Sequence, residues 1–251
     1  MNERKAAECS KHGEYESRGI ALANLVHWTG CPTCDEERTQ ERRECEEAER
    51  AAARACMAQQ RRSYARIPSR FDGCTFVNYV TDTDGKRTAL TAVRNFVETF
   101  ESRLDPRGKE PFWLAMHGRV GTGKSHLCVS AINAVIDMHS AQYVEIPAIV
   151  RRVSATWRRD SDESESDVFR SLTTCKLLVI DEIGVQRGTE FEQTIMTDLL
   201  NMRYSNHMPT ILATNYGKND LDAVLGDRIA DRLREVGKRV IFDWESCRGK
   251  Y

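Results

Sequence analysis

The chain has 251 residues, 40% of them hydrophobic, so it can bury one sizeable core and carry a small second module. Its 37 lysines and arginines nearly balance its 38 aspartates and glutamates, so net charge alone favours no class of partner. Because no apolar run approaches the roughly 20 residues that cross a bilayer, and nine cysteines follow a charged start, we expect a cytoplasmic protein with reduced or metal-bound thiols and no membrane partner.

A Cys/His cluster dominates residues 1–34, which we interpret as a zinc-binding module. Its two ligand pairs, Cys9-x₂-His12 and Cys31-x₂-Cys34, lie beside Gly and Pro residues. Four thiolate and imidazole ligands suit a tetrahedral, structural Zn²⁺ ion. Metal binding would supply the folding energy of so short a segment. The predicted ligands are Cys9, His12, Cys31 and Cys34. His27 is an alternative fourth ligand, and a disordered tail with unliganded cysteines is the alternative to a metal site.

A charged segment without Gly or Pro follows at residues 35–67. It is rich in Ala, Glu, Arg and Gln, which favour helices. Its acidic residues all lie in the first half, and the charged residues of its second half are all arginines. The helix dipole favours this distribution. We therefore predict one long helix that ends before Pro68. Its weak, alanine-rich stripe fits a solvated spacer as well as a partner-binding helix.

Strands and helices alternate in residues 68–251, which we interpret as one domain. The predicted strands are residues 111–116, 142–146, 176–180, 209–213 and 238–242. The predicted helices are residues 88–100, 124–138, 148–159, 168–172, 190–204 and 220–236. Strands separated by helices predict an α/β fold with a parallel sheet that is covered on both faces.

The turn after the first of these strands, GRVGTGKS, fits the phosphate-binding pattern G-x-x-x-x-G-K-[ST]. Its glycines let backbone N–H groups face phosphate oxygens, and the next helix adds its positive N-terminal end. Lys124 would reach the β- and γ-phosphates of ATP, and the Ser125 hydroxyl would hold Mg²⁺. The alternative is a Gly-rich turn without function. The predicted ATP-binding residues of this loop are Gly118, Arg119, Val120, Gly121, Thr122, Gly123, Lys124 and Ser125.

Polar residues follow two other buried strands, where parallel sheets bind their ligands. Asp181 and Glu182 come after LLVI, and Asn215 comes after ILAT. We expect Asp181 to bind Mg²⁺, Glu182 to polarise the attacking water and Asn215 to contact the γ-phosphate or that water. Taken alone, the acids could mark an ordinary strand end and Asn215 an ordinary turn.

Together, GRVGTGKS, LLVIDEIG and ILATN resemble the AAA+ ATPases, and GDRIADRL followed by VIFDWESCR is similar to the ending of the DnaC-type replicative helicase loaders of the DnaA/DnaC/IstB branch. The resemblance covers residues 68–251. It implies a self-associating AAA+ ATPase that hydrolyses ATP at subunit interfaces and loads the replicative DNA helicase onto single-stranded DNA. The short segment after Val236 leaves no room for a helical lid. The Cys/His module departs from the helical front of the best-known loaders, and residues 35–67 are the expected helicase-docking region.

The same resemblance gives a role to two arginines of GDRIADRL. In AAA+ assemblies a neighbouring subunit supplies an arginine that stabilises charge on the transferred phosphoryl group. Arg232 is the expected arginine of this kind, and Arg228 is a second phosphate-facing or interface arginine. The alternative is that both pair with helix carbonyls or with Asp227 and Asp231.

A basic segment, Ile149–Arg159, interleaves four arginines with Trp157. By resemblance it faces the central channel, where phosphate contacts and stacking would track single-stranded DNA. The alternative is a solvated helix face with Trp157 in the core. Two other functions remain open at this point. One is a transposition helper ATPase of the IstB type, which binds duplex DNA. The other is a P-loop kinase for a small molecule, which would need neither the Asn215 strand nor the GDRIADRL helix.

Overall fold

The computed structural model describes residues 3–22, 25–184 and 189–247. The chain divides into two compact units, Met1–Cys56 and Met57–Tyr251, and helix α1 (Pro32–Tyr64) contributes to both. Among the described residues, none of the helices combines the length and the apolar character that a membrane span requires.

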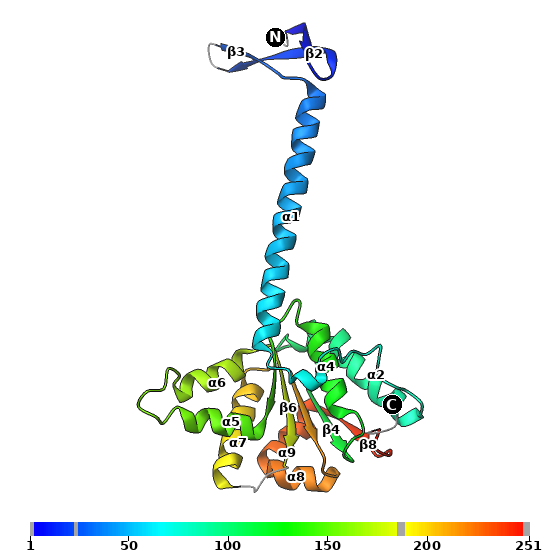
Figure 1. Ribbon diagram of the computed structural model, residues 1–251, viewed down its shortest axis with the longest axis vertical. Helices are drawn as coiled ribbons and strands as arrows, with labels where there is room; N and C mark the ends of the chain where they lie inside the picture. The colour runs from blue at the N-terminus through cyan, green and yellow to red at the C-terminus, as the bar shows by residue number, and fades with distance from the viewer. Residues whose placement is uncertain (1–2, 23–24, 185–188, 248–251) are drawn as a thin grey trace. The chain divides into compact units, whose positions relative to one another are not determined.

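The first unit contains a three-stranded antiparallel sheet in the order β1-β2-β3 (Figure 1). Its strands are β1 (Arg4–Cys9), β2 (Gly13–Leu22) and β3 (Leu25–Trp28). Gly13 follows the first turn with a φ of 77°, a left-handed conformation that glycine adopts without strain. The hydroxyl of the buried Ser17 donates to the carbonyl of Thr29, which ties β2 to the segment that leads into α1. These strands were not anticipated for the Cys/His module.

Helix α1 confirms the prediction of one long helix and begins earlier than expected. It has 33 residues, none of them buried, with Asp35 in its first turn and Arg61 and Arg62 in its last turn. Pro32 stands at its start, where a missing backbone N–H costs nothing, so Cys34 lies in the first helical turn. Arg62 pairs with Asp137 at 2.8 Å, and both belong to the second unit.

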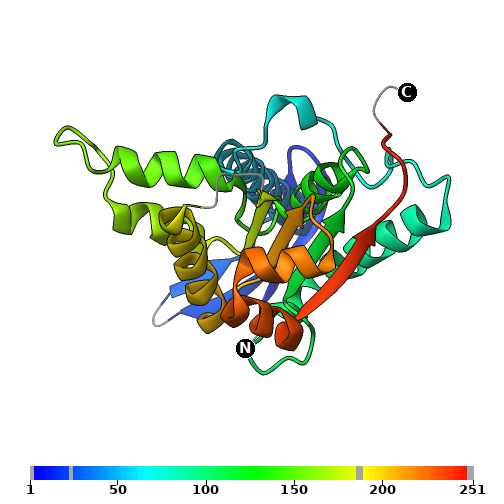
Figure 2. The same ribbon diagram turned by 90° about the horizontal axis from the view of Figure 1, so that it is seen from below.

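A five-stranded parallel sheet in the order β5-β6-β7-β4-β8 forms the centre of the second unit (Figure 2). Its strands are β4 (Trp113–Gly118), β5 (Ala141–Glu145), β6 (Leu177–Ile183), β7 (Thr210–Thr214) and β8 (Gly237–Phe242). Strand β7 therefore lies between β4, which leads into the phosphate loop, and β6, which carries the acidic pair near its end. This sheet confirms the α/β fold predicted from the sequence.

Helices cover both faces of this sheet, because alternate strand residues point to opposite sides. Leu114 and Met116 pack in one core with α2 and α4, whereas Trp113 and Ala115 pack in the other with α5 to α9. The helical segments are η1 (Ser69–Phe71), α2 (Asp84–Glu98), α3 (Phe100–Arg103), α4 (Lys124–Val135), α5 (Ile146–Ala155), α6 (Glu165–Thr174), α7 (Glu190–Ser205), α8 (Lys218–Leu225) and α9 (Asp227–Val236).

The prediction of a single helix over residues 220–236 was wrong. Helix α8 ends at Leu225 and α9 begins at Asp227, because Gly226 between them has a φ of 73° and breaks the helical path. The break gives the GDRIADRL segment a helix of its own, which begins directly after this glycine.

A fully buried arginine links elements of the core that contains α5 to α9. Arg203 of α7 donates to the carbonyls of Leu172, Cys175 and Pro209 and to the hydroxyl of Thr210. Burial lowers the pKa of its guanidinium. Leu172 lies in the last turn of α6 and Cys175 between α6 and β6, and Pro209 and Thr210 lie at the start of β7. Arg203 therefore links α6, β6 and β7 to α7.

Candidate functional site

The predicted phosphate loop follows β4 and requires glycine at two close approaches. A Cβ atom on Gly118, whose φ is 135°, would lie 2.1 Å from the carbonyl oxygen of Phe242. On Gly123, whose φ is 93°, it would lie 2.8 Å from the ring of Tyr79. The glycines therefore let the loop curl against β8 and the segment before α2, and Gly123 is the N-cap of α4.

Lys124, the first residue of α4, is only 5% exposed and folds back under the loop. Its ammonium donates to the carbonyls of Gly118 at 2.9 Å and Arg119 at 2.6 Å. A buried ammonium at a helix N-terminus, inside a ring of turned backbone, is a site that favours anions. This geometry fits the phosphates of a nucleotide.

A β-bulge aims the two predicted acids. Ile180 pairs with Leu212 and Ile183 with Thr214, so β6 carries one extra residue between these pairs. Glu182 has a φ of 57°, a strained conformation for a residue with a side chain and one that is typical of functional sites. The bulge leaves Asp181 buried and Glu182 partly exposed.

The Asp181 carboxylate is the most connected group of the site. One of its oxygens accepts hydrogen bonds from the Ser125 hydroxyl and from the Tyr143 hydroxyl, both at 2.6 Å. The other oxygen accepts from the backbone N–H of Glu182 at 2.7 Å. Burial and the neighbouring Asp181 charge raise the pKa of Tyr143, so its hydroxyl stays a donor. Ser125 and Asp181 thus bring together the hydroxyl and carboxylate oxygens that suit Mg²⁺.

A cleft of about 250 Å³ gathers most of the residues predicted for nucleotide chemistry. Asp181, Glu182 and Asn215 line it together with residues 120–125 of the phosphate loop. The remaining two loop residues, Gly118 and Arg119, contribute the carbonyls that hold Lys124.

The two predicted arginines lie elsewhere, on α9, and neither lines this cleft. Arg228 is exposed. Arg232 is half-buried, donates to the amide oxygen of Asn201 and lies over the ring of Tyr204, 4.3 Å from its centroid. Both contacts come from α7. A role for Arg232 in phosphoryl transfer therefore requires the cleft of another chain.

Some residues that shape the site were missed by sequence reasoning. Tyr143 was assigned only to a strand, since an aromatic residue in an apolar run is usually core. The end of the chain also holds the loop: the Trp244 indole donates to the Thr122 carbonyl at 3.0 Å, and the Cys247 N–H donates to the Gly121 carbonyl at 2.8 Å. The WESC motif was the available signal for these contacts.

The four predicted zinc ligands converge in the first unit. Their ligand atoms all lie within 4.8 Å of one another, and the group comprises Cys9, His12, Cys31 and Cys34. The Cys9 and Cys34 sulfurs are 3.5 Å apart, and Cys34 Sγ lies 3.3 Å from His12 Nδ1. Tetrahedral zinc, with bonds of about 2.0–2.3 Å, separates its ligand atoms by roughly 3.5–3.8 Å, so the set fits the ion. His27 lies on β3 opposite Ile20 and is outside this group.

The surroundings of the cluster also suit a metal. The far nitrogen of His12, Nε2, lies 3.1 Å from a carboxylate oxygen of Glu37, the arrangement that orients zinc-binding imidazoles. Backbone N–H groups of Lys11 and His12 lower the pKa of the Cys9 thiol to about 6. The hydrogen bond with Cys9 is the main cause that raises the pKa of Cys34 to about 11. A divalent cation would favour the thiolate form of all three cysteines.

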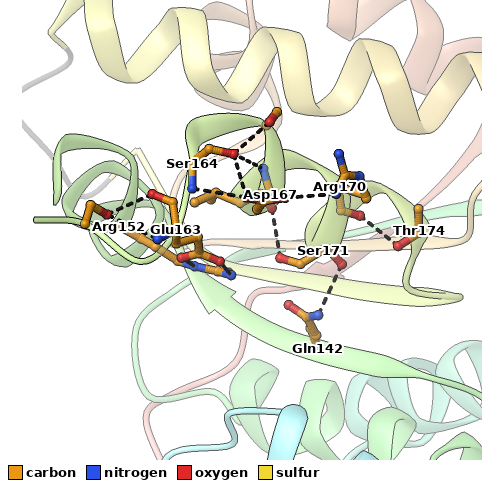
Figure 3. Close-up of polar contacts among 11 residues, drawn as sticks. Gln142, Arg152, Glu163, Ser164, Asp167, Arg170, Ser171 and Thr174 are labelled. Atoms are coloured by element: carbon orange, nitrogen blue, oxygen red, sulfur yellow. Dashed lines mark hydrogen bonds and ion pairs between the residues drawn. The ribbon is translucent and has the colours of Figure 1, made fainter. Parts of the chain in front are cut away.

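The basic segment Ile149–Arg159 covers the last part of α5 and the start of the loop to α6. Arg152 forms a two-pronged ion pair with Glu163, which lowers the pKa of that carboxyl, and Ser164 caps α6 in a capping box with Asp167 (Figure 3). These contacts fix the far end of the loop to both helices.

The end of α5 and the start of this loop present an aromatic ring among cations. Trp157 is 65% exposed, with its ring centroid 5.3 Å from that of Phe191, and Arg151, Arg158 and Arg159 are exposed. The alternative that placed Trp157 in the core was wrong, because α5 ends at Ala155 and the helical stripe of Ile149 and Val153 stops short of it.

The parallel sheet, the phosphate loop and the bulged acidic strand define a P-loop ATP-binding domain of the AAA+ class. Residues 109–250 match the family described as IstB-like ATP binding protein. The chain is 31% identical over 179 residues to the replicative helicase loader DnaC of Escherichia coli strain K12, covering 70% of each chain. It is 31% identical over 177 residues to the uncharacterized protein YdaV of the same strain, covering 70% of this chain and 68% of YdaV.

Solved structures agree on the fold. The DnaC helicase loader superposes with a TM-score of 0.61 at 20% identity, over 70% of this chain and 100% of that chain. DnaA from Aquifex aeolicus bound to AMPPCP gives 0.58 at 21% identity, over 72% and 52%. The chain belongs to the family of IstB-like ATP binding proteins and DnaC-type replicative helicase loaders, which confirms the resemblance stated from the sequence.

The Tyr143 hydroxyl should tune the metal requirement of the nucleotide site. Tyr143→Phe keeps the ring and removes one of two hydroxyl donors to the Asp181 carboxylate. We expect a shift of about tenfold or more in the Mg²⁺ concentration that half-saturates ATP hydrolysis, because one hydrogen bond to a charged group contributes about 1.5–3 kcal/mol. Nucleotide affinity measured in EDTA should not change. Equal Mg²⁺ titrations for Tyr143→Phe and the native chain would contradict a role at Asp181.

Protein purified without chelator should contain about one zinc per chain, measured by elemental analysis. A Cys31→Ser/Cys34→Ser double variant should lose the ion and the fold of the first unit. The control is Cys45→Ser/Cys56→Ser, which changes two exposed cysteines of α1 and should retain the zinc. Zinc-free native protein with a folded first unit would refute the assignment.

Proposed function

We propose that this protein is an ATP-hydrolysing loader that places the replicative DNA helicase on single-stranded DNA. The similarity to DnaC of Escherichia coli, at 31% identity over 70% of both chains, carries this proposal. The site supports it, because residues suited to phosphate, metal and water contacts share one cleft. Such a loader would work in the cytoplasm.

The proposed chemistry uses the cleft residues in distinct roles. Backbone N–H groups of the loop and Lys124 bind and orient the phosphates of ATP. Ser125 and Asp181 would hold Mg²⁺, which neutralises charge on the phosphate oxygens during transfer. Glu182 accepts a hydrogen bond from the attacking water and polarises it, and Asn215 donates to the γ-phosphate or to that water.

Hydrolysis in this proposal needs a second copy of the chain. Arg232 reaches the γ-phosphate bound by a neighbour, and Arg228 supports it at the interface. The intrachain contacts of Arg232 with α7 favour this role, because they hold its guanidinium outside its own cleft. An arginine supplied in trans contributes about 10³–10⁵ to the rate in well-studied cases of phosphoryl transfer.

Helicase and DNA would contact different parts of the chain. The zinc module and the helix over residues 35–67 are proposed to dock the helicase. Single-stranded DNA is proposed to contact the basic segment Ile149–Arg159, where Trp157 offers a stacking surface and the exposed arginines offer phosphate contacts.

The runner-up function is a transposition helper ATPase, with which the family description is consistent. A helper of this kind would bind duplex DNA and need no helicase. A small-molecule P-loop kinase fits less well, because its turnover would depend neither on DNA nor on protein concentration.

The loading function predicts a direct effect on the helicase of the same host. Purified chain, ATP and the replicative helicase should yield helicase bound to single-stranded DNA circles, detected by gel filtration and by strand unwinding. Glu182→Gln should load poorly, and the chain should prefer single-stranded over duplex DNA. Equal stimulation of its ATPase by duplex DNA, without helicase capture, would favour the transposition helper.

Mixing two inactive variants tests the shared site. Arg232→Ala should keep its ATP affinity and lose turnover, since its own loop still binds the nucleotide, and Glu182→Gln should behave in the same way. A mixed interface can pair the intact Glu182 of the first variant with the intact Arg232 of the second. Activity should therefore return on mixing and rise with single-stranded DNA.

The control for this experiment is a mixture of Lys124→Ala with Arg232→Ala. The Lys124 variant binds no nucleotide but still supplies Arg232, so it should also rescue the Arg232→Ala chain. A lack of rescue in both mixtures, under conditions where mixed oligomers form, would show that Arg232 does not act in trans.

A further inference from the structure

An arginine from the linker between α1 and α2 reaches the acidic pair. Arg70 belongs to η1 and lines the nucleotide cleft beside Glu182 and Asn215. Its Nη2 atom lies 3.5 Å from Glu145 Oε1 and 4.0 Å from Glu182 Oε1, so one guanidinium nitrogen stands between two carboxylates.

The linker holds Arg70 in this place through three contacts. The carbonyl of the buried Ala65 accepts a hydrogen bond from the backbone N–H of Tyr143, which fastens the linker to the edge of β5. Phe71 packs against the ring of Tyr143 with centroids 6.2 Å apart, and the Arg70 guanidinium lies 4.7 Å from the Phe71 centroid. The charge is thereby placed over an aromatic face.

Folding stability does not account for this arrangement. The side chains of Arg70 and Glu182 are 59% and 38% exposed, and ion pairs at such exposure stabilise proteins little. Glu182 also has a strained backbone, which persists where other contacts hold the residue in place. The pair lies in the cleft that Lys124 also lines, so the contact acts on a carboxylate of the nucleotide site.

We propose that Arg70 is a positioning residue for Glu182: anchored by Glu145, it fixes the Glu182 carboxylate where the attacking water is polarised. This inference rests on the proposed function, in which Glu182 acts on the water. Arg70 would then be an arginine supplied by the same chain, whereas Arg232 is supplied by a neighbour. Arg70 comes from η1, a segment that belongs neither to the sheet nor to the helices that cover it.

The test separates turnover from binding. Arg70→Gln should lower kcat by about tenfold, since displacing a catalytic group by a fraction of an ångström is costly. Its affinities for ATP and ADP, measured with fluorescent analogues, should stay within about twofold of the native values. Arg70→Lys should recover part of kcat. Arg66→Gln, the same change at an exposed arginine of the same linker, is the control and should leave kcat unchanged.

A double-mutant cycle tests the anchor. Glu145→Gln should lower kcat less than Arg70→Gln does, and it should have no further effect when Arg70 is already glutamine, because the two act through one contact. Additive losses of kcat would overturn the proposed anchor.

Three results would overturn the positioning role. An unchanged kcat in Arg70→Gln would show that the contact with Glu182 has no role in hydrolysis. A raised kcat would show that Arg70 inhibits the action of Glu182. A loss of ATP affinity greater than that of ADP affinity would show that Arg70 binds the γ-phosphate itself. Failure of the proposed function is seen separately, because Glu182→Gln would then retain full hydrolysis.

Discussion

The hydrogen bonds that converge on the Asp181 carboxylate are the constraint on which the nucleotide site depends. A single oxygen accepts from Ser125 at the start of α4 and from Tyr143 of β5, so three elements must meet within hydrogen-bond distance. They meet only if β5 is the neighbour of β6 and if the bulge turns Asp181 toward α4. Sheet order, bulge and loop must therefore all be in place to satisfy one buried acceptor, which would be costly if it were left without donors.

Local patterns made the nucleotide cleft predictable from the sequence. The phosphate loop and the acidic pair are each contiguous, and buried strands of a parallel sheet are continuous apolar runs that place the residues after them at one edge. Tyr143 could not be found in this way, since its partner is 38 residues away and depends on the register of β5 against β6. Arg70 was also missed, because a turn after a long helix carries no periodic signal.

Two other differences between sequence and structure have equally physical causes. Strands β1 and β2 of the first unit carry many charged residues, so their apolar pattern is weak. The break at Gly226 was overlooked because a lone glycine inside an apolar helical pattern is tolerated, and only its left-handed φ ends the helix. The exposed Trp157 follows from the end of α5, whose last residue is uncertain in any reading of propensity alone.

In the proposed mechanism, two arginines outside the phosphate loop, Arg70 and Arg232, divide the control of one reaction. Arg70 touches the cleft of its own chain through a partly exposed contact, so it can act on Glu182 as soon as one chain is folded. Arg232 is held by Asn201 and Tyr204 on its own chain, and in the proposed mechanism it meets a phosphate across an interface. On this proposal, binding of nucleotide needs one chain, and turnover needs two. A protein built in this way would hold ATP while it is free and hydrolyse it once assembly brings its copies together.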